Sequence, residues 1–381
     1  MAFFTKEIEN FITANLNTDL HSLLLRKSPF PEISMQEIVQ QIKGRKVAGK
    51  KFPFLLKDGI VFPPNLNLEQ SSSEATGKYK AGLVSGKKMV DLTSGFGIDA
   101  YFVSENFDEV TLVEQNNELL QTVENNWNIL GKKAEFINAE LEGFLKNNNE
   151  HFNLIYLDPA RRDENRNKVF LLEDLSPNLL TLQDELIAVA DRILIKLSPL
   201  IDISYLISVL KNISEIHVVA VKNDVKELLV LIDSQKNSER IKISCVNLET
   251  DEPEFSFYFD EIASATPKMG ESGGFLFIPN NAVLKTGAFN LISERFRLKK
   301  LHPNTQLYFS DEKTERFPGR LLKVEETDAK SLKKGEQFNI ISKNYPLKPE
   351  EIKSKYKLKD GGEKYLIFTQ SEKGKIILKS V

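Results

Sequence analysis

The chain has 381 residues, of which 41 % are hydrophobic and 28 % charged, and its formal net charge is −3. This composition excludes a disordered chain, and the length argues for two or three domains. Apolar runs such as 193–197 are far shorter than the roughly 20 residues that cross a bilayer, so we expect no membrane segment. The N-terminus lacks a charged region followed by a long apolar stretch, so we expect no secretory signal. The single cysteine, Cys245, cannot form an internal disulfide, which fits a cytoplasmic protein. Its apolar neighbours predict a buried position.

Residues 1–84 are predicted to form a helical N-terminal region. The leucine-rich segment 20–25 indicates one amphipathic helix, and the apolar spacing in 38–42 indicates another. A polar stretch follows, in which Ser72 or Ser73 is suited to cap the next helix.

Residues 85–270 are predicted to form an α/β core. Short apolar runs alternate there with helical segments, which implies a largely parallel sheet of seven strands covered by helices on both faces. One helix is expected to end at Gly131. The strands are expected at 89–92, 110–114, 135–138, 154–158, 193–197, 216–221 and 228–232. The last two runs are too close for a helical crossover, so they should be antiparallel neighbours.

The remainder of the chain is predicted to be a separate α+β region with a helix at 282–297. It is basic, because residues 281–381 hold 22 Lys and Arg against 13 Asp and Glu, whereas residues 1–280 hold 29 against 41. An appended module that binds a polyanion would show this asymmetry, since cations that neutralise phosphates release counterions. A solvated, lysine-rich surface would show it equally well.

The first core strand runs into Asp91, Thr93, Gly95, Gly97 and Asp99, which form a candidate cofactor-binding loop. Two glycines let the backbone turn tightly from strand to helix and approach a ligand. The spacing Gly-x-Gly-x-x-Ala also suits a dinucleotide, but an acid four residues before the first glycine would repel a pyrophosphate. The same acid would attract the aminoacyl and sulfonium end of S-adenosylmethionine.

The next two strand ends also carry acids. Glu114 closes the second strand, where a carboxylate accepts hydrogen bonds from ribose hydroxyls in NAD-binding and S-adenosylmethionine-binding folds alike. Glu140 follows the third strand. It could belong to a polar pair that binds the adenine amino group, or it could cap the next helix, and both interpretations stay open.

The fourth strand leads into Asp158, Pro159, Arg161 and Arg162, at the edge where open α/β sheets bind ligands. We expect Asp158, Pro159 and Arg161 to form the catalytic element, with Asp158 also near the cofactor. The two arginines are expected to bind a substrate phosphate or carboxylate, although Arg162 could instead pair with neighbouring acids. Lys196, at the end of the fifth strand, could contact the acceptor or a phosphate, or be a surface charge.

Taken together, these motifs resemble those of bacterial class I methyltransferases with a C-terminal THUMP-like domain. The resemblance is carried by segments 70–74, 79–80, 91–99 (DLTSGFGID), 158–163 (DPARRD), 196–199 and 226–229. It implies a Rossmann-like core, S-adenosylmethionine as cofactor, a ferredoxin-like segment at 271–316 and a THUMP-like domain at 317–381. THUMP domains of RNA-modifying enzymes bind RNA, so the resemblance also implies an RNA substrate, tRNA or rRNA, held by the basic C-terminal region.

Two features depart from better-known RNA enzymes. Those that methylate exocyclic amines stack an aromatic residue on a flipped base, and Arg161 stands at that place. Pyrimidine C5 methylation needs a cysteine nucleophile, which these motifs lack, so we exclude it. Three alternatives stay open: an NAD-dependent oxidoreductase, a small-molecule methyltransferase, and a non-catalytic RNA-binding protein with a methyltransferase-like fold. No metal is expected, and the oligomeric state is not indicated.

Overall fold

The computed structural model describes residues 4–63, 68, 71–161, 171–235 and 240–381. By their internal contacts, the residues divide into two units. The first comprises Met1–Ser214 and Leu229–Ser238, and the second comprises Glu215–Leu228 and Glu239–Val381. Among the described helices, none has both the length and the apolar character that a membrane span requires.

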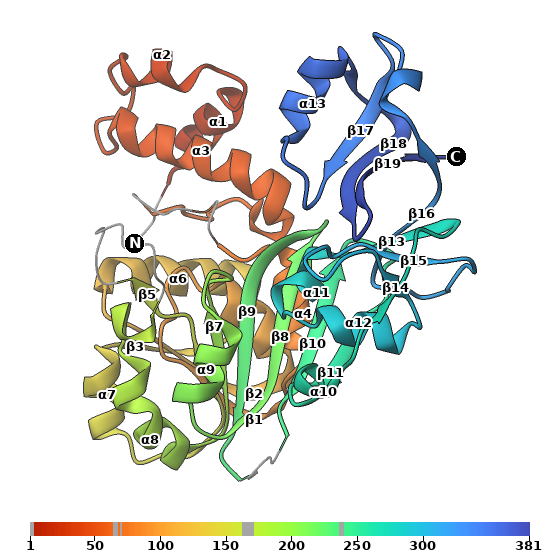
Figure 1. Cartoon of the computed structure of the whole chain (residues 1–381). Coiled ribbons are helices and arrows are strands. Elements are labelled where there is room, and N and C mark those ends of the chain that lie inside the picture. The colour runs from red at the N-terminus through yellow and green to blue at the C-terminus, as the bar shows by residue number, and fades with distance from the viewer. Residues whose placement is uncertain (1–3, 64–67, 69–70, 162–170, 236–239) are drawn as a thin grey trace. The chain divides into compact units, whose positions relative to one another are not determined.

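Helices begin the first unit, as predicted (Figure 1). They are α1 (Lys6–Ala14), α2 (Leu20–Leu24), α3 (Met35–Lys51) and the short 3₁₀ helix η1 (Pro53–Leu55). Ser34 and Glu37 form a capping box at the start of α3, which satisfies two backbone N–H groups. Ile8, Ile12 and Ile42 belong to the small apolar core that α1, α2 and α3 share.

One nine-stranded sheet forms the core, in the order β11-β10-β8-β9-β7-β4-β1-β2-β3. Its strands are β1 (Gly86–Asp91), β2 (Phe107–Glu114), β3 (Glu135–Asn138), β4 (Phe152–Leu157), β7 (Ala190–Leu197), β8 (Ile213–Val221), β9 (Asp224–Asp233), β10 (Lys242–Leu248) and β11 (Phe255–Tyr258). All seven predicted strands are present, but β10 and β11 make the sheet larger than expected. Strand β10 alternates apolar with polar residues at its start instead of showing a continuous apolar run. Cys245 lies buried within it, and burial raises the pKa of its thiol, as expected for a core residue.

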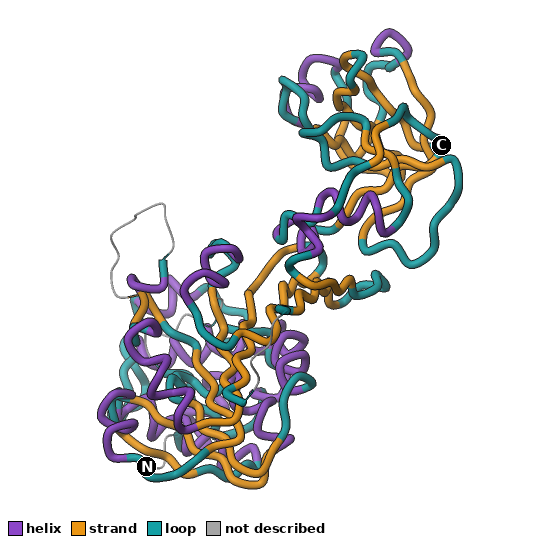
Figure 2. Tube along the Cα trace, turned by 60° about the horizontal axis from the view of Figure 1, so that its bottom comes forward, coloured by secondary structure: helices purple, strands orange, loops and turns teal. Residues whose placement is uncertain are grey.

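Helices and short elements connect the strands of the first unit, and Figure 2 shows helices flanking the strands. They are α4 (Glu74–Ala81), α5 (Ile98–Val103), η2 (Ser104–Asn106), α6 (Asn117–Leu130), α7 (Leu141–Asn147), β5 (Ala160–Arg161), η3 (Leu172–Asp174), β6 (Leu175–Ser176), α8 (Leu179–Val189) and α9 (Ile203–Val209). Ser73 caps α4, and Gly131 ends α6 in the left-handed conformation, both as predicted.

Parallel pairing brings the ends of three strands to one edge of the sheet. Strand β1 pairs in parallel with β2 and β4, so that Asp91 lies opposite Leu112 on one side and Tyr156 on the other. Strands β8 and β9 are neighbours joined by Lys222 and Asn223 alone. Both linking residues have positive φ, as a tight hairpin turn requires, so the two strands run antiparallel as predicted.

An eight-stranded sheet forms most of the second unit, in the order β12-β14-β15-β13-β16-β19-β18-β17. Its elements are α10 (Glu261–Ser264), β12 (Lys268–Met269), β13 (Phe275–Pro279), α11 (Asn281–Lys285), α12 (Phe289–Arg295), β14 (Lys299–Lys300), β15 (Tyr308–Ser310), β16 (Gly319–Thr327), η4 (Ala329–Ser331), β17 (Gln337–Ser342), α13 (Pro349–Tyr356), β18 (Lys359–Ser371) and β19 (Gly374–Ser380). The single helix predicted at 282–297 is wrong. Two helices form instead, because Gly287 takes φ +73° between them.

Candidate active site

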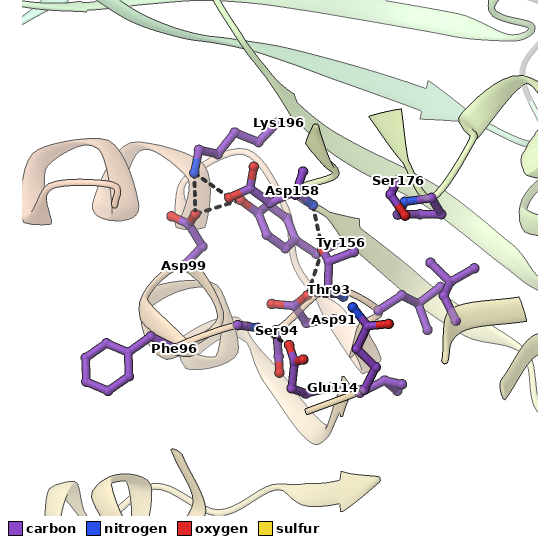
Figure 3. Close-up of a pocket in the computed structure, with 18 of the residues that line it drawn as sticks. Asp91, Thr93, Ser94, Phe96, Asp99, Glu114, Tyr156, Asp158, Ser176 and Lys196 are labelled. Atoms are coloured by element: carbon purple, nitrogen blue, oxygen red, sulfur yellow. Dashed lines mark hydrogen bonds and ion pairs between the residues drawn. The ribbon is translucent and has the colours of Figure 1, made fainter. Parts of the chain in front are cut away.

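A cavity of about 620 Å³ opens beside the carboxyl ends of β1, β2 and β4 (Figure 3). All eight residues predicted to bind a cofactor line it: Asp91, Thr93, Gly95, Gly97, Asp99, Glu114, Glu140 and Asp158. Lys196 of the predicted substrate residues lines it as well. The topology of a parallel sheet thus collects residues that are far apart in the sequence.

The glycine loop is shaped by two left-handed residues, Gly95 with φ +53° and Gly97 with φ +72°. A Cβ on Gly97 would lie 2.9 Å from atoms of both Trp127 and Val123, so a larger residue would push α6 away. A Cβ on Gly95 would meet little protein, and its constraint is the backbone conformation. The loop is therefore held tightly against α6.

Two backbone N–H groups hold the carboxylate of Glu114. The N–H of Gly95 donates to Oε2 at 3.0 Å, and that of Asn116 donates to Oε1 at 2.9 Å. A carboxylate oxygen accepts more than one hydrogen bond, so Glu114 retains capacity for a ligand. Glu140 stands at the N-cap position of α7, but its side chain makes no capping hydrogen bond, so the capping interpretation is not supported.

Asp91 is almost completely buried, with 1 % of its surface exposed. Its Oδ1 accepts a hydrogen bond from the N–H of Thr93 at 2.9 Å. Burial raises the pKa of Asp91 well above its ordinary value, and the carboxylates of Asp99, Asp158 and Glu114 raise it further. No ion pair to Asp91 is formed by the residues that the structure describes. A cation placed beside it would favour its charged form.

Asp99 is also buried, but it has several partners. Its Oδ1 lies 3.2 Å from Nζ of Lys80, and its Oδ2 lies 3.4 Å from Nζ of Lys196. The hydroxyls of Tyr156 and Ser72 donate to the same Oδ2 at 2.8 and 2.9 Å. Burial alone would raise the pKa of Asp99, but these cations and donors hold it below its ordinary value. Asp99 therefore lines the cavity as part of a polar network.

Lys196 links this network to Asp158. Its Nζ lies 2.6 Å from Oδ2 of Asp158, and its side chain is only 14 % exposed, so the interpretation as a surface charge is wrong. The backbone N–H of Asp158 donates to Oγ1 of Thr93 at 2.6 Å, which fixes the chain just after β4. Figure 3 shows Lys196 reaching both carboxylates. The Asp158 side chain stays 40 % exposed and accessible to a ligand.

Three further predicted residues, Pro159, Arg161 and Arg162, are not among the described residues that line the cavity. Pro159 follows β4 but does not line the cavity. Arg161 belongs to β5, which pairs with β6, and its side chain lies outside what the structure describes. Arg162 also lies outside the described residues. Ser176 and Pro177 line the cavity and were not predicted, because only the pairing of β5 with β6 brings them there.

Tyr156 and Ser72 line the cavity, and Lys80 contacts Asp99; the sequence did not reveal these three roles. One signal was present for Lys80: it shares the buried face of α4 with Thr76 and Gly77, at helical spacing. A lysine on a buried helix face requires an anionic partner, which predicts an ion pair but not its location.

Three segments match known families. Residues 73–190 match a family described as conserved hypothetical protein 95, residues 275–318 a ferredoxin-like domain, and residues 319–379 a THUMP domain-like family. No curated protein matched.

A crystal structure from Porphyromonas gingivalis W83, described as that of a candidate methyltransferase, is similar to the whole chain. The identity is 31 %, the match covers 100 % of this chain and 98 % of that one, and the TM-score is 0.87. With the domain matches, it confirms the predicted fold class: an α/β core with ferredoxin-like and THUMP-like domains after it.

Two other structures match only in part. A tRNA (uracil-54, C5)-methyltransferase from Pyrococcus abyssi in complex with S-adenosyl-L-homocysteine has 21 % identity over 45 % of this chain and 41 % of that one, with a TM-score of 0.34. An rRNA methylase from Streptococcus thermophilus has 14 % identity over 42 % and 93 %, with a TM-score of 0.31. These values are too low to bear on function.

Proposed function

Since the chain belongs to the family of class I methyltransferases with a C-terminal THUMP-like domain, we propose that it transfers a methyl group from S-adenosylmethionine to RNA, either tRNA or rRNA. The observation that carries this proposal is the buried acid Asp91 beside the glycine loop, which forms no ion pair with the residues that the structure describes. A cofactor with a cationic end would supply the missing positive charge. A pyrophosphate there would meet Asp91, Glu114 and Asp158 and be repelled.

The residues of the cavity fit this cofactor. Asp91 would hold its cationic end, Gly95 and Gly97 would let it approach the backbone, and Glu114 would accept hydrogen bonds from its ribose. Glu140 follows β3, which lies next to β2 on the side away from β1, and would contact the adenine of the cofactor. Thr93 orients two of these acids at once, since its N–H donates to Asp91 and its hydroxyl accepts from the backbone of Asp158.

When bound, S-adenosylmethionine supplies an already activated methyl group, so the main task of the chain is alignment. Well-oriented reactants are worth roughly 7 to 11 kcal/mol of barrier. Asp158 would accept a hydrogen bond from the acceptor, and Lys196 would fix its orientation through the 2.6 Å contact. Pro159 would hold the turn after Asp158, and Arg161 would bind a substrate phosphate.

RNA as the substrate is supported by the THUMP domain-like segment, residues 319–379, and by the excess of cations in residues 281–381. Arg161 and Arg162, next to the cavity in the sequence, are suited to phosphate because guanidinium groups bind it through two parallel hydrogen bonds. Such a substrate is found in the cytoplasm. A small-molecule methyltransferase would need none of these cations and would show no affinity for RNA.

The proposal is tested by comparing modified nucleosides, by mass spectrometry, in RNA from a deletion strain and its parent. We expect one methylated nucleoside to disappear and to return when the wild-type gene is restored. The Asp158→Ala variant should not restore it, although the variant should still bind S-adenosylhomocysteine with nearly unchanged affinity. An unchanged nucleoside profile would contradict the RNA substrate, and loss of cofactor affinity in the variant would contradict the role of Asp158.

A further inference from the structure

The second half of α3 and the turn after it are strongly basic. Residues 38–57 contain six cations and no acid, although the whole chain has more acids than cations. The six are Lys43, Arg45, Lys46, Lys50, Lys51 and Lys57. Arg45 pairs with Glu9, and Lys51 donates to two backbone carbonyls. Four lysines remain to be considered, of which Lys46 donates to the carbonyl of Thr18 at 3.4 Å.

Three of these lysines lie on one face of α3. Lys43, Lys46 and Lys50 follow the spacing i, i+3 and i+7, and all three are exposed, whereas Ile38 and Ile42 face the core. At 1.5 Å per residue, the row extends over about 10 Å. Lys57 adds a fourth exposed charge from the turn that follows η1.

The row borders two hollows, both of which Lys46 and Lys50 line. One, of about 550 Å³, is lined by Lys46, Lys50 and Lys57 together with the apolar side chains of Leu16 and Leu56. The acid Asp58 lines it as well, and its carboxylate pairs with Lys6. The other, of about 430 Å³, is lined, among the described residues, by Lys43, Lys46, Val47, Lys50 and Lys51 of α3. Leu56 is half exposed, so the first hollow has an apolar part beside its cations.

None of the four lysines has a carboxylate within 4.0 Å among the residues that the structure describes. Elsewhere in the first unit, most lysines do have one, for example Lys88, Lys132 and Lys211. Neighbouring cations without counter-ions repel one another, and a polyanion that lies along the row removes this repulsion. The charge pattern therefore fits a ligand with repeated negative charges.

Helix α3 is also bound to the wall of the candidate active site. The ammonium of Lys51 donates to the carbonyl of Ser71 at 2.5 Å, and Ser71 lines the cavity. The chain after α3 is fixed to α6 as well, since Asn126 exchanges two hydrogen bonds with the backbone of Val61 at 2.9 and 2.8 Å. A polyanion bound to α3 would thus lie at a defined place relative to the cavity.

We propose that Lys43, Lys46, Lys50 and Lys57 form an RNA-binding surface, the α3 lysine surface, which contacts the phosphates of the substrate. The apolar part of the adjoining hollow, Leu16 and Leu56, would pack against a base or ribose. This inference rests on the proposed function and adds a second site of RNA contact, separate from the basic C-terminal region. It would act on affinity and leave the cofactor site unaffected.

The test compares two triple variants of the full chain in binding to a fluorescein-labelled oligouridylate by fluorescence anisotropy, at salt concentrations from 50 to 200 mM. One variant carries Lys43→Gln, Lys46→Gln and Lys50→Gln. The control carries Lys27→Gln, Lys133→Gln and Lys146→Gln, which removes the same charge from exposed lysines on separate elements. Calorimetry with S-adenosylhomocysteine confirms that both variants keep the fold of the cofactor site.

We expect the α3 variant to lose at least about tenfold in affinity at 50 mM salt, and its salt slope to decrease by about 2, since each phosphate contact to a single strand contributes about 0.7. The control should stay close to the wild type. An equal effect of both variants would contradict the α3 lysine surface but not the RNA substrate proposed above. If the wild-type chain itself fails to bind the oligonucleotide, the RNA substrate proposed above is contradicted together with this inference.

Discussion

Two regions of one cavity each contain a buried aspartate, and the pKa values of these two aspartates are shifted in opposite directions. At the end of β1, Asp91 accepts a backbone hydrogen bond and is surrounded by other acids, and its pKa is raised. At the start of α5, Asp99 is held by Lys80, Lys196 and two hydroxyls, and its pKa is lowered. Both aspartates are buried, so the difference between their pKa values comes from their neighbours. The chain balances the charge of Asp99 with its own residues, whereas the ionised form of Asp91 would need the positive charge of a ligand.

The largest effect on stability is expected at Asp99, where the chain itself supplies the balancing positive charge. Lys80→Met keeps the size of the side chain but removes the fully buried cation beside Asp99. Breaking a buried ion pair on one side costs about 3 to 5 kcal/mol in the free energy of unfolding, measured by denaturant titration. As a control, Asp184→Asn breaks the exposed pair with Lys211 and should cost less than about 1 kcal/mol. Equal costs would show that the network around Asp99 is not structural.

At Asp91, the corresponding change should affect ligand binding instead of stability. Asp91→Asn removes the charge that we assign to the cationic end of the cofactor, and a hydrogen bond to a charged group is worth about 1.5 to 3 kcal/mol. We expect the affinity for S-adenosylhomocysteine to fall about 10- to 150-fold, while the melting temperature stays equal or rises. Glu142→Gln, at an exposed acid of the same cavity, should change neither value much. A lower melting temperature with unchanged affinity would show that Asp91 has a structural role, and would contradict its assignment to cofactor binding.

The raised pKa of Asp91 also predicts a pH dependence of binding. Stability that arises from protonated Asp91 is complete below its unfolded pKa of about 4 and is lost as the pH rises through the higher pKa of the folded state. A cationic ligand favours the ionised form, so binding below that higher pKa should release a proton. The affinity should then rise by up to about tenfold per pH unit. Calorimetry in buffers of different ionisation enthalpy measures the release, and Asp91→Asn should abolish it.

Tyr156→Phe should have the smallest effect. It removes one hydroxyl donor from Asp99 but leaves both lysines and Ser72 in place. A single hydrogen bond of this kind contributes about 0.5 to 1.5 kcal/mol to the free energy of unfolding. A loss as large as that of Lys80→Met would mean that the hydroxyl contributes as much as the buried lysine to keeping Asp99 charged.

The sequence predicted the acidic residues of this cavity, and of the two lysines that contact Asp99 it predicted Lys196 and missed Lys80. Asp91, Glu114 and Asp158 each end a recognisable strand, and parallel strands necessarily bring their carboxyl ends together. Lys80 contacts Asp99 from a helix that precedes the sheet. Its spacing on the buried face of α4 indicates an ion pair, but the identity of the partner depends on the fold. Lys196 was found from its strand end, but its burial and its two partners depend on the fold.

Other errors have local causes. Strand β10 alternates apolar with polar residues near its start and lacks the continuous run typical of a buried strand, so the sheet was predicted with seven strands. The helix at 282–297 shows a continuous pattern, but Gly287 divides it. The domain boundaries at 84, 270 and 316 stay predictions, and so do the individual roles of the site residues.

The most direct test is a calorimetric titration of the purified full chain with S-adenosylhomocysteine and, separately, with NADH. If Asp91, the glycine loop and Glu114 bind a nucleoside that carries an α-ammonium group, only S-adenosylhomocysteine, which shares this group with the cofactor, should give heat, with one site per chain. Binding of NADH without binding of S-adenosylhomocysteine, or no binding of either, would contradict the account.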